Sequence, residues 1–283
     1  MFILTGNFSS KIYGFLRFIR PEIILLGVVC VFIGALVAGS EPFSLKLFLG
    51  MIAVFCMSAG VHPFNDYFDY GVDKINHPNR PLPSGIFKRI TGLYLGLFLF
   101  AFSVVLSLLI NVYCFSIILI IIFLTFFYEL YLKNKGLLGN FLVAFSVSTA
   151  FLYGGAIATD FLKPLFFTLV TFFVFFGREI LLDVRDFEGD KKTRNTLPLV
   201  IGEKKSIYIG SILVILSVLM LFIPFFYGFY SIWYGLLAIP LTIFTIYALS
   251  LSFTDIKNAG KTTELLRVSM IFGLILFIIA IYT

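Results

Sequence analysis

The sequence predicts an all-α, polytopic membrane protein whose nine transmembrane helices surround a central cavity. Its 283 residues are 60% hydrophobic and only 13% charged, and the mean hydropathy is +1.05. These values exclude a soluble domain of this length and indicate repeated membrane spans. No Pro- or Gly-rich linker interrupts the chain, so residues 1–283 are expected to form a single transmembrane domain.

Nine apolar runs of about the length of a bilayer core follow one another along the chain. They cover residues 23–38, 47–64, 90–110, 112–132, 137–159, 161–182, 207–226, 232–251 and 265–282. Before them, residues 8–20 mix bulky apolar and basic side chains, as an interfacial helix does. Since no A-x-A-like cleavage site follows, we expect the first span to be retained and not removed as a signal peptide.

Lysine and arginine are concentrated in alternate connections. Of the 21 such residues, all but Lys46 and Lys163 lie before the first span or around every second connection after it. This asymmetry predicts a cytoplasmic N-terminus and places the longer, more polar loops on the cytoplasmic side of the cell membrane. The net charge of +6 arises from these same loops, so no nucleic-acid partner is expected.

An acidic stretch closes the second span. Asp66, Asp69 and Asp73 are spaced i, i+3, i+7, and Asn65 precedes them. On a helix these side chains share one face, so several oxygen ligands are presented together. Crowded carboxylates repel one another unless a hard divalent cation bridges them, and an all-oxygen set favours Mg²⁺ or Ca²⁺ over zinc.

The same spacing recurs after the sixth span, at Asp183, Asp186 and Asp190. Two acidic helix ends on one side of the membrane suggest two facing metal sites that clamp one polyanion. Mg²⁺ completes its coordination with phosphate oxygens, so the polyanion is expected to be a phosphate or diphosphate. The alternative, solvated loop acids, is disfavoured because carboxylates at a membrane are costly unless they are functional.

Cations and tyrosines near the acids are candidates for phosphate binding. Arg80 lies in a proline-rich loop after the first motif. Because it is close to the acidic cluster, we expect its side chain to bind a phosphate and not a lipid headgroup. Between the fourth and fifth spans, Tyr128, Tyr131 and Lys133 are placed to close over a leaving diphosphate; the alternative is an aromatic belt with a positive-inside lysine. His62 has no partner at ligand spacing and is expected to be a hydrogen-bonded helix residue.

With these residues the chain resembles the UbiA-type intramembrane prenyltransferases. The family signatures N-D-x-x-D-x-x-x-D and D-x-x-D-x-x-x-D stand at residues 65–73 and 183–190, and the R-P pair at 20–21 and the N-R-P-L-P-S-G run at 79–85 also match. The resemblance implies that Mg²⁺ held by both motifs binds an isoprenyl diphosphate. Loss of diphosphate then leaves an allylic cation for an acceptor to attack.

The resemblance also implies a role for each polar residue. The implied metal ligands are Asn65, Asp66, Asp69, Asp73, Asp183, Asp186 and Asp190. Those expected to be catalytic are Asp69, Asp73, Asp186 and Asp190. The residues expected at the diphosphate are Arg80, Lys133, Tyr128, Tyr131 and Lys191. Arg20 and Lys74 are expected at the phosphate of the acceptor.

Within the family, both loops look most like those of the archaeal digeranylgeranylglyceryl phosphate synthases. This similarity implies transfer of a geranylgeranyl group from geranylgeranyl diphosphate to the hydroxyl of geranylgeranylglyceryl phosphate, which forms the second ether bond of an archaeal membrane lipid. The nearest alternative is prenylation of an aromatic acceptor in quinone biosynthesis. A membrane transporter is less favoured, because carriers bind near the bilayer midplane and both motifs here lie at helix ends.

Overall fold

The structure is a computed structural model that describes residues 8–191 and 195–281. Every regular element within these residues is a helix, so the all-α prediction is confirmed. The long helices are α2 (Pro21–Val37), α3 (Leu45–Asn76), α4 (Arg89–Ile110), α5 (Val112–Phe127), α6 (Leu137–Ala158), α7 (Leu162–Arg185), α10 (Glu203–Met220), α12 (Ile232–Thr254) and α13 (Ala259–Ile281). The short ones are α1 (Phe8–Ile19), α8 (Phe187–Asp190), α9 (Leu197–Ile201), α11 (Ile223–Phe226), the π-helix η1 (Tyr128–Leu132) and the 3₁₀-helix η2 (Ile256–Asn258).

Within the described residues, eight helices are long and apolar enough to cross a membrane, and the bent pair formed by α1 and α2 raises the number to nine. The bend of 49° falls between the two helices, where Arg20 has a left-handed backbone with φ of 56°. Pro21 follows at the start of α2, a position where its missing N–H is not needed. The prediction of a nine-span membrane protein is therefore confirmed.

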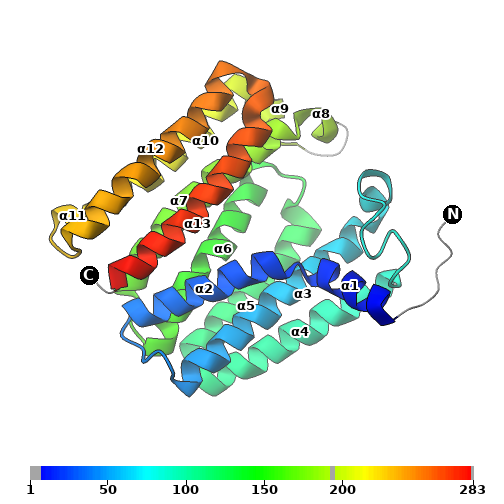
Figure 1. The fold of residues 1–283 in the computed structure, drawn as a ribbon. Helices are drawn as coiled ribbons and strands as arrows, with labels where there is room; N and C mark the ends of the chain where they lie inside the picture. The colour runs from blue at the N-terminus through cyan, green and yellow to red at the C-terminus, as the bar shows by residue number, and fades with distance from the viewer. Residues whose placement is uncertain (1–7, 192–194, 282–283) are drawn as a thin grey trace.

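The long helices form two groups that meet at α2 and α6 (Figure 1). In the first group α3 packs against α2 and α4, and in the second α7 packs against α6, α10 and α13. Each group has its own buried apolar cluster, one around Phe64 and Phe100 and the other around Phe167 and Phe277. The groups diverge on one side, and the cavity described below lies between them.

Glycine permits close contact between helix backbones in this bundle. A Cβ added to Gly34 on α2 would collide with the carbonyl oxygen of Phe151 on α6, and one added to Gly177 on α7 would collide with the carbonyl oxygen of Gly210 on α10. Apolar lipid offers helices little hydrophobic reason to associate, so close van der Waals contact through small residues holds them together.

The connections that carry the acidic motifs lie at one end of the bundle. Figure 1 shows the loop after α3, the start of α6 and the short helices α8 and α9 near one another at this end. The connection between α2 and α3, helix α11 and the end of α13 lie at the opposite end. Both motifs therefore stand on the same side of the membrane-spanning helices.

Candidate active site

The first acidic motif lies on the last turns of α3. This helix continues without a break through Pro63 to residue 76, so the expected helical face is formed. The Asp66 and Asp73 side chains are buried, whereas Asp69 is partly exposed. A membrane-spanning helix therefore carries three carboxylates at its end, and each one has a cationic partner.

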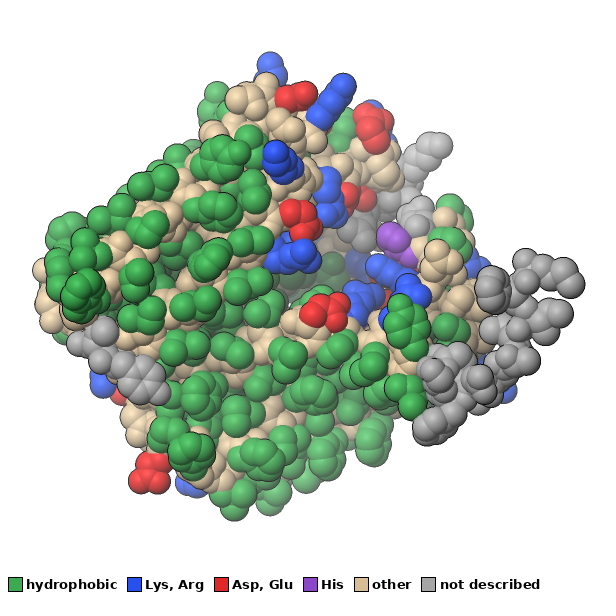
Figure 2. Space-filling view, in the orientation of Figure 1, with side chains coloured by type: hydrophobic (Ala, Val, Ile, Leu, Met, Phe, Trp, Pro, Cys, Tyr) green, Lys and Arg blue, Asp and Glu red, His purple; other side chains and the backbone are tan. Residues whose placement is uncertain are grey.

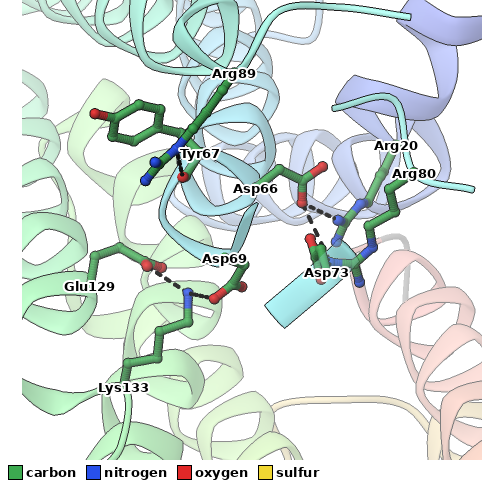
Figure 3. Close-up of polar contacts among 9 residues, drawn as sticks. All are labelled: Arg20, Asp66, Tyr67, Asp69, Asp73, Arg80, Arg89, Glu129 and Lys133. Atoms are coloured by element: carbon green, nitrogen blue, oxygen red, sulfur yellow. Dashed lines mark hydrogen bonds and ion pairs between the residues drawn. The ribbon is translucent and has the colours of Figure 1, made fainter. Parts of the chain in front are cut away.

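Two arginines from other elements bind the carboxylates of this motif (Figure 3). Arg20, at the joint of α1 and α2, places its Nη2 2.8 Å from Oδ1 of Asp66. Arg80, in the loop after α3, places Nη1 2.7 Å from both carboxylate oxygens of Asp73 and 3.6 Å from Asp66. Charge-assisted contacts of this length are strong, so the arginines compensate the burial of these acids.

Lys133 bridges two acids from different helices. Its Nζ lies 2.8 Å from Oδ1 of Asp69 on α3 and 2.6 Å from Oε2 of Glu129 on η1 (Figure 3). The π-helix η1 interrupts the regular turn at the end of α5 and brings Glu129 and Lys133 to the same point. Glu129, which the sequence analysis did not select, is buried.

The structure separates the two candidate tyrosines. Tyr128 lines the central cavity. Tyr131 is 62% exposed, and its ring packs against Phe127 on the outside of the bundle. Tyr131 therefore does not reach the site at which it was expected, because η1 turns it toward the exterior.

The second acidic motif is divided between two helices. Asp183 lies on α7 and accepts a hydrogen bond of 2.7 Å from Nδ2 of Asn140 on α6. Asp186 ends α7 and begins α8, and its carboxylate binds Arg185 at 2.7 Å. Asp190 closes α8. The D-x-x-D-x-x-x-D spacing thus does not continue along one helix, because the chain turns at Asp186.

The segment from η1 to the start of α6 joins the two motifs. Lys133 touches the first motif, and Asn140 touches the second. Between them, the carbonyl oxygen of Asn134 accepts a hydrogen bond of 3.4 Å from the backbone N–H of Asn195, which follows the second motif. Acids more than a hundred residues apart in the sequence are therefore held at one end of the bundle.

Two basic residues of the predicted site lie at its edge. Lys74 is exposed and stands 4.6 Å from the ring centroid of Tyr70. Lys191 is also exposed, pairs with Glu188 at 2.7 Å and lies over the ring of Phe187. The neighbouring basic residues Lys192 and Arg194 lie outside the described residues.

A cavity of about 650 Å³ opens from this polar end into the apolar interior. Figure 2 shows the hollow on one face of the molecule, with charged side chains on both sides of its mouth. Asn65 and Tyr128 border it near the first motif, and most of its remaining wall is aliphatic or aromatic. His62 also faces it. Within the described residues no protein partner is seen for the His62 imidazole, so the hydrogen bond expected for this residue stays a prediction.

Charged residues that the sequence analysis missed stand on the opposite wall. Arg178 and Glu179 of α7 and Arg267 of α13 line the cavity. The signal for the first two was present in the sequence, because they interrupt the apolar run 161–182. Ionisable residues within a membrane span are functional candidates by default.

The donor atoms at the first motif fit a hard cation. Oδ1 of Asn65 and Oδ2 of Asp66 are buried oxygens with no hydrogen-bond partner. Across the described residues, no three His, Cys, Asp or Glu side chains stand close enough to form a complete metal site alone. Such incomplete oxygen sets suit Mg²⁺, which takes further ligands from water and substrate phosphates.

Comparison with known proteins decides the family. The profile of the UbiA prenyltransferase family matches residues 27–282. The chain belongs to the UbiA prenyltransferase family. A digeranylgeranylglyceryl phosphate synthase of Sulfurisphaera tokodaii is 33% identical over 94% of this chain and 97% of that protein. The enzyme of the same name from Pyrococcus furiosus is 35% identical over 95% of this chain and 97% of its own length.

Solved structures of UbiA proteins have the same fold. A digeranylgeranylglyceryl phosphate synthase structure is 31% identical to this chain, with a TM-score of 0.80 over 97% of this chain and 100% of that one. A UbiA homologue from Archaeoglobus fulgidus, bound to GPP and Mg²⁺, is 20% identical and has a TM-score of 0.68 over 95% of this chain and 100% of its own. The helical architecture around the cavity is therefore that of the UbiA family.

Proposed function

We propose that this UbiA-family protein transfers a geranylgeranyl group from geranylgeranyl diphosphate to the free hydroxyl of geranylgeranylglyceryl phosphate, forming the second ether bond of an archaeal membrane lipid. One structural observation carries the proposal: two acidic motifs and several cations stand together where a long apolar cavity begins. The site suits a substrate with a diphosphate head and an isoprenoid tail. The names of the relatives, which match nearly the whole chain, support this acceptor.

The reaction exchanges one carbon–oxygen bond for another. The bond between C1 of the prenyl group and the diphosphate oxygen breaks, and its electron pair leaves with the diphosphate. The acceptor's hydroxyl oxygen then bonds to C1, and its proton is released to solvent or to the diphosphate. The protein's task is to stabilise the negative charge that grows on the leaving group.

Cations on the polar side of the cavity are placed for this task. Lys133 and Arg80 now bind Asp69 and Asp73, and both stand beside the face on which a diphosphate would bind. Tyr128 adds a phenolic hydroxyl in the cavity wall. In a site that excludes water, such fixed charges and dipoles stabilise a leaving anion far more than they would in solvent.

The same end of the bundle supplies the ligands that Mg²⁺ would need. Asn65, Asp69 and Asp73 of α3 would hold one ion, and Asp183, Asp186 and Asp190 would hold the other, with Asp66 behind the first set. Bound Mg²⁺ would neutralise diphosphate oxygens and stabilise them as they leave. The structure of the A. fulgidus homologue bound to GPP and Mg²⁺ supports a Mg²⁺-dependent reaction of an isoprenyl diphosphate in this fold.

The apolar part of the cavity would hold an isoprenoid chain. Along one side it is lined by aliphatic residues of α3 and α5, which are Val54, Met57, Ile117, Ile118, Ile121 and Leu124. Transfer of a long hydrocarbon chain from water to such a surface is favourable in proportion to the area covered. Substrate binding thus places the diphosphate at the polar end and the chain in the interior.

We further propose that residues 1–283 form one domain in the cell membrane, with the N-terminus and the active site facing the cytoplasm. The Lys and Arg distribution supports this orientation. The position of both motifs at one end of the bundle is consistent with it.

Mass spectrometry of products tests the proposed reaction. The purified chain would receive geranylgeranyl diphosphate, Mg²⁺ and either geranylgeranylglyceryl phosphate or a panel of aromatic acids. We expect the diether phosphate as product, formed only with Mg²⁺, and no such product from the Asp186→Ala variant. Prenylation of an aromatic acid alone would refute the proposed acceptor, and solute transport in liposomes without diphosphate release would refute the enzyme class.

A further inference from the structure

We propose that Arg178 and Arg267, on the wall formed by α7 and α13, bind the phosphate monoester of the acceptor. This inference rests on the proposed function, and it assigns the acceptor's charged group to residues outside both acidic motifs. The sequence had suggested Arg20 and Lys74 for this role. In the structure Arg20 binds Asp66, and the exposed Lys74 lies over the ring of Tyr70.

The burial of Arg178 within a membrane span requires an explanation. Its side chain is only 15% exposed, and it lies on α7 five positions before Asp183, which is about 7.5 Å along a helix axis. A charged side chain is costly at this depth, so it is expected to have a specific partner or task. Arg178 and Asp183 point about 140° apart on α7, so the arginine is not part of the acidic motif.

The guanidinium of Arg178 has one anchoring hydrogen bond, at Nε, and a longer ion pair at Nη1. Its Nε donates a hydrogen bond of 3.2 Å to the carbonyl oxygen of Thr263 on α13. Its Nη1 lies 3.5 Å from Oε1 of Glu179, well beyond the length of a charge-assisted hydrogen bond. Glu264 on α13 also acts on this guanidinium electrostatically, and the side chain borders the cavity. The guanidinium is a rigid fork of donors that matches a phosphate.

Arg267 supplies a second charge from the facing helix. It lies one turn after Thr263 on α13 and also borders the cavity. Its side chain is 61% exposed and pairs with Glu264 at 2.7 Å. Exposed ion pairs of this kind contribute little free energy, so Arg267 can exchange its partner for a phosphate at low cost.

The two sides of the cavity mouth suit two different anions. Figure 2 shows charged side chains on the side of α13 and, across the hollow, on the side of α1 and α2. The side with the acidic motif has oxygen ligands for a metal and therefore suits the donor's diphosphate. The α7–α13 side has two arginines and one carboxylate, that of Glu179, among its charged lining residues, so its excess positive charge suits a phosphate bound without metal. Below Arg267, Met270, Leu274 and Phe277 offer an apolar surface for the acceptor's chain.

The test compares acceptors with and without the phosphate. Purified wild type, Arg178→Gln and Arg267→Gln would be assayed with geranylgeranylglyceryl phosphate and with dephosphorylated geranylgeranylglycerol, at saturating donor. Loss of one charge-assisted contact should raise KM for the phosphate acceptor about 10- to 100-fold. We expect KM for the uncharged acceptor and KM for the donor to stay within about twofold of the wild-type values, because neither molecule makes the contact that the substitution removes.

Controls separate this role from a structural one and from failure of the proposed function. Lys261→Gln removes one positive charge from the exposed surface of α13 and should leave all constants unchanged. Thermal unfolding of each variant shows whether Arg178 has a purely structural role, in which its contact with Thr263 holds α7 to α13. The Arg267→Gln variant tests phosphate binding without changing that contact. Three results would overturn the inference. KM for the phosphate acceptor could stay unchanged in both variants, or KM could rise equally for both acceptors. Alternatively, KM for the phosphate acceptor could rise selectively in Arg20→Gln and not in these variants. If the wild-type protein does not prenylate geranylgeranylglyceryl phosphate, the proposed function itself is refuted.

Discussion

Replacement of Arg80 by glutamine tests the electrostatic account of the site most directly. Arg80 Nη1 contacts both oxygens of Asp73 at 2.7 Å, and the Asp73 side chain is only 4% exposed. Arg80→Gln removes the partner of a buried carboxylate and, in the proposed mechanism, a charge that stabilises the leaving diphosphate. Stability and activity should therefore both fall, for different reasons.

The structure sets the size of each effect. Loss of one partner from a fully buried ion pair costs about 3–5 kcal/mol. Arg80 keeps 29% of its side chain exposed, so water partly screens the pair and we expect a loss of about 1–3 kcal/mol in the free energy of unfolding. Loss of one preorganised group that stabilises a developing anion lowers kcat about 10²–10³-fold.

A double substitution separates the two effects. Arg80→Gln combined with Asp73→Asn removes both charges, so thermal stability should recover toward wild type. Activity should not recover, because the double variant lacks both the charge at the diphosphate and the carboxylate of a proposed Mg²⁺ ligand. Arg89→Gln is the matched control, since Arg89 is exposed, donates to the carbonyl oxygen of Tyr67 and lies over the rings of Tyr67 and Tyr70, with no contact to an acid of the motif among the described residues.

The assay is release of diphosphate from geranylgeranyl diphosphate by purified protein, with thermal unfolding measured on the same samples. Activity of Arg80→Gln within threefold of wild type would refute the proposed role in leaving-group stabilisation. Recovery of activity in the double variant would show that Arg80 serves only to balance Asp73.

Three further predictions concern other residues of the chain. Asp69→Asn should lower Mg²⁺-dependent turnover at least about 100-fold, as judged by diphosphate release over a Mg²⁺ titration; wild-type rates would remove Asp69 from the site. Tyr128→Phe should lower kcat about 10-fold or more, whereas Tyr131→Phe should match wild type; equal effects would contradict their different placement. Gly177→Ala should lower thermal stability by about 1–3 kcal/mol because its Cβ would meet the backbone of α10. Gly273→Ala should not lower thermal stability, because the position has open space around it. Similar unfolding temperatures for the two variants would contradict the close packing of α7 against α10.

Much of the site could be predicted because its signals are local. The spacing of Asp66, Asp69 and Asp73 fixes their common face once the segment is helical, and α3 is helical through all three. The repeat at Asp183 and Asp186 identified the second motif. The same periodicity failed after Asp186, because a break between α7 and α8 depends on how the following chain packs and not on the aspartate spacing.

Other residues could not be found by spacing. Glu129 and Lys133 are spaced i, i+4, but only the tertiary structure brings this pair to Asp69 on α3. Asn140 gains its role only because α6 packs against α7 and meets Asp183. Neither residue belongs to a motif, since each acts through a partner on another helix or at an irregular turn.

The sequence by itself determined that this is a helical membrane protein with two acidic motifs at the ends of its spans. Hydropathy and charge act on each segment separately, so a linear pattern is enough to specify them. Only the tertiary structure decided which cation meets which acid, that Tyr128 and not Tyr131 faces the cavity, and that Arg178 lines the cavity and contacts α13. These facts depend on the rotation and packing of helices that are distant in sequence, and ion pairs and hydrogen bonds act only within a few ångströms.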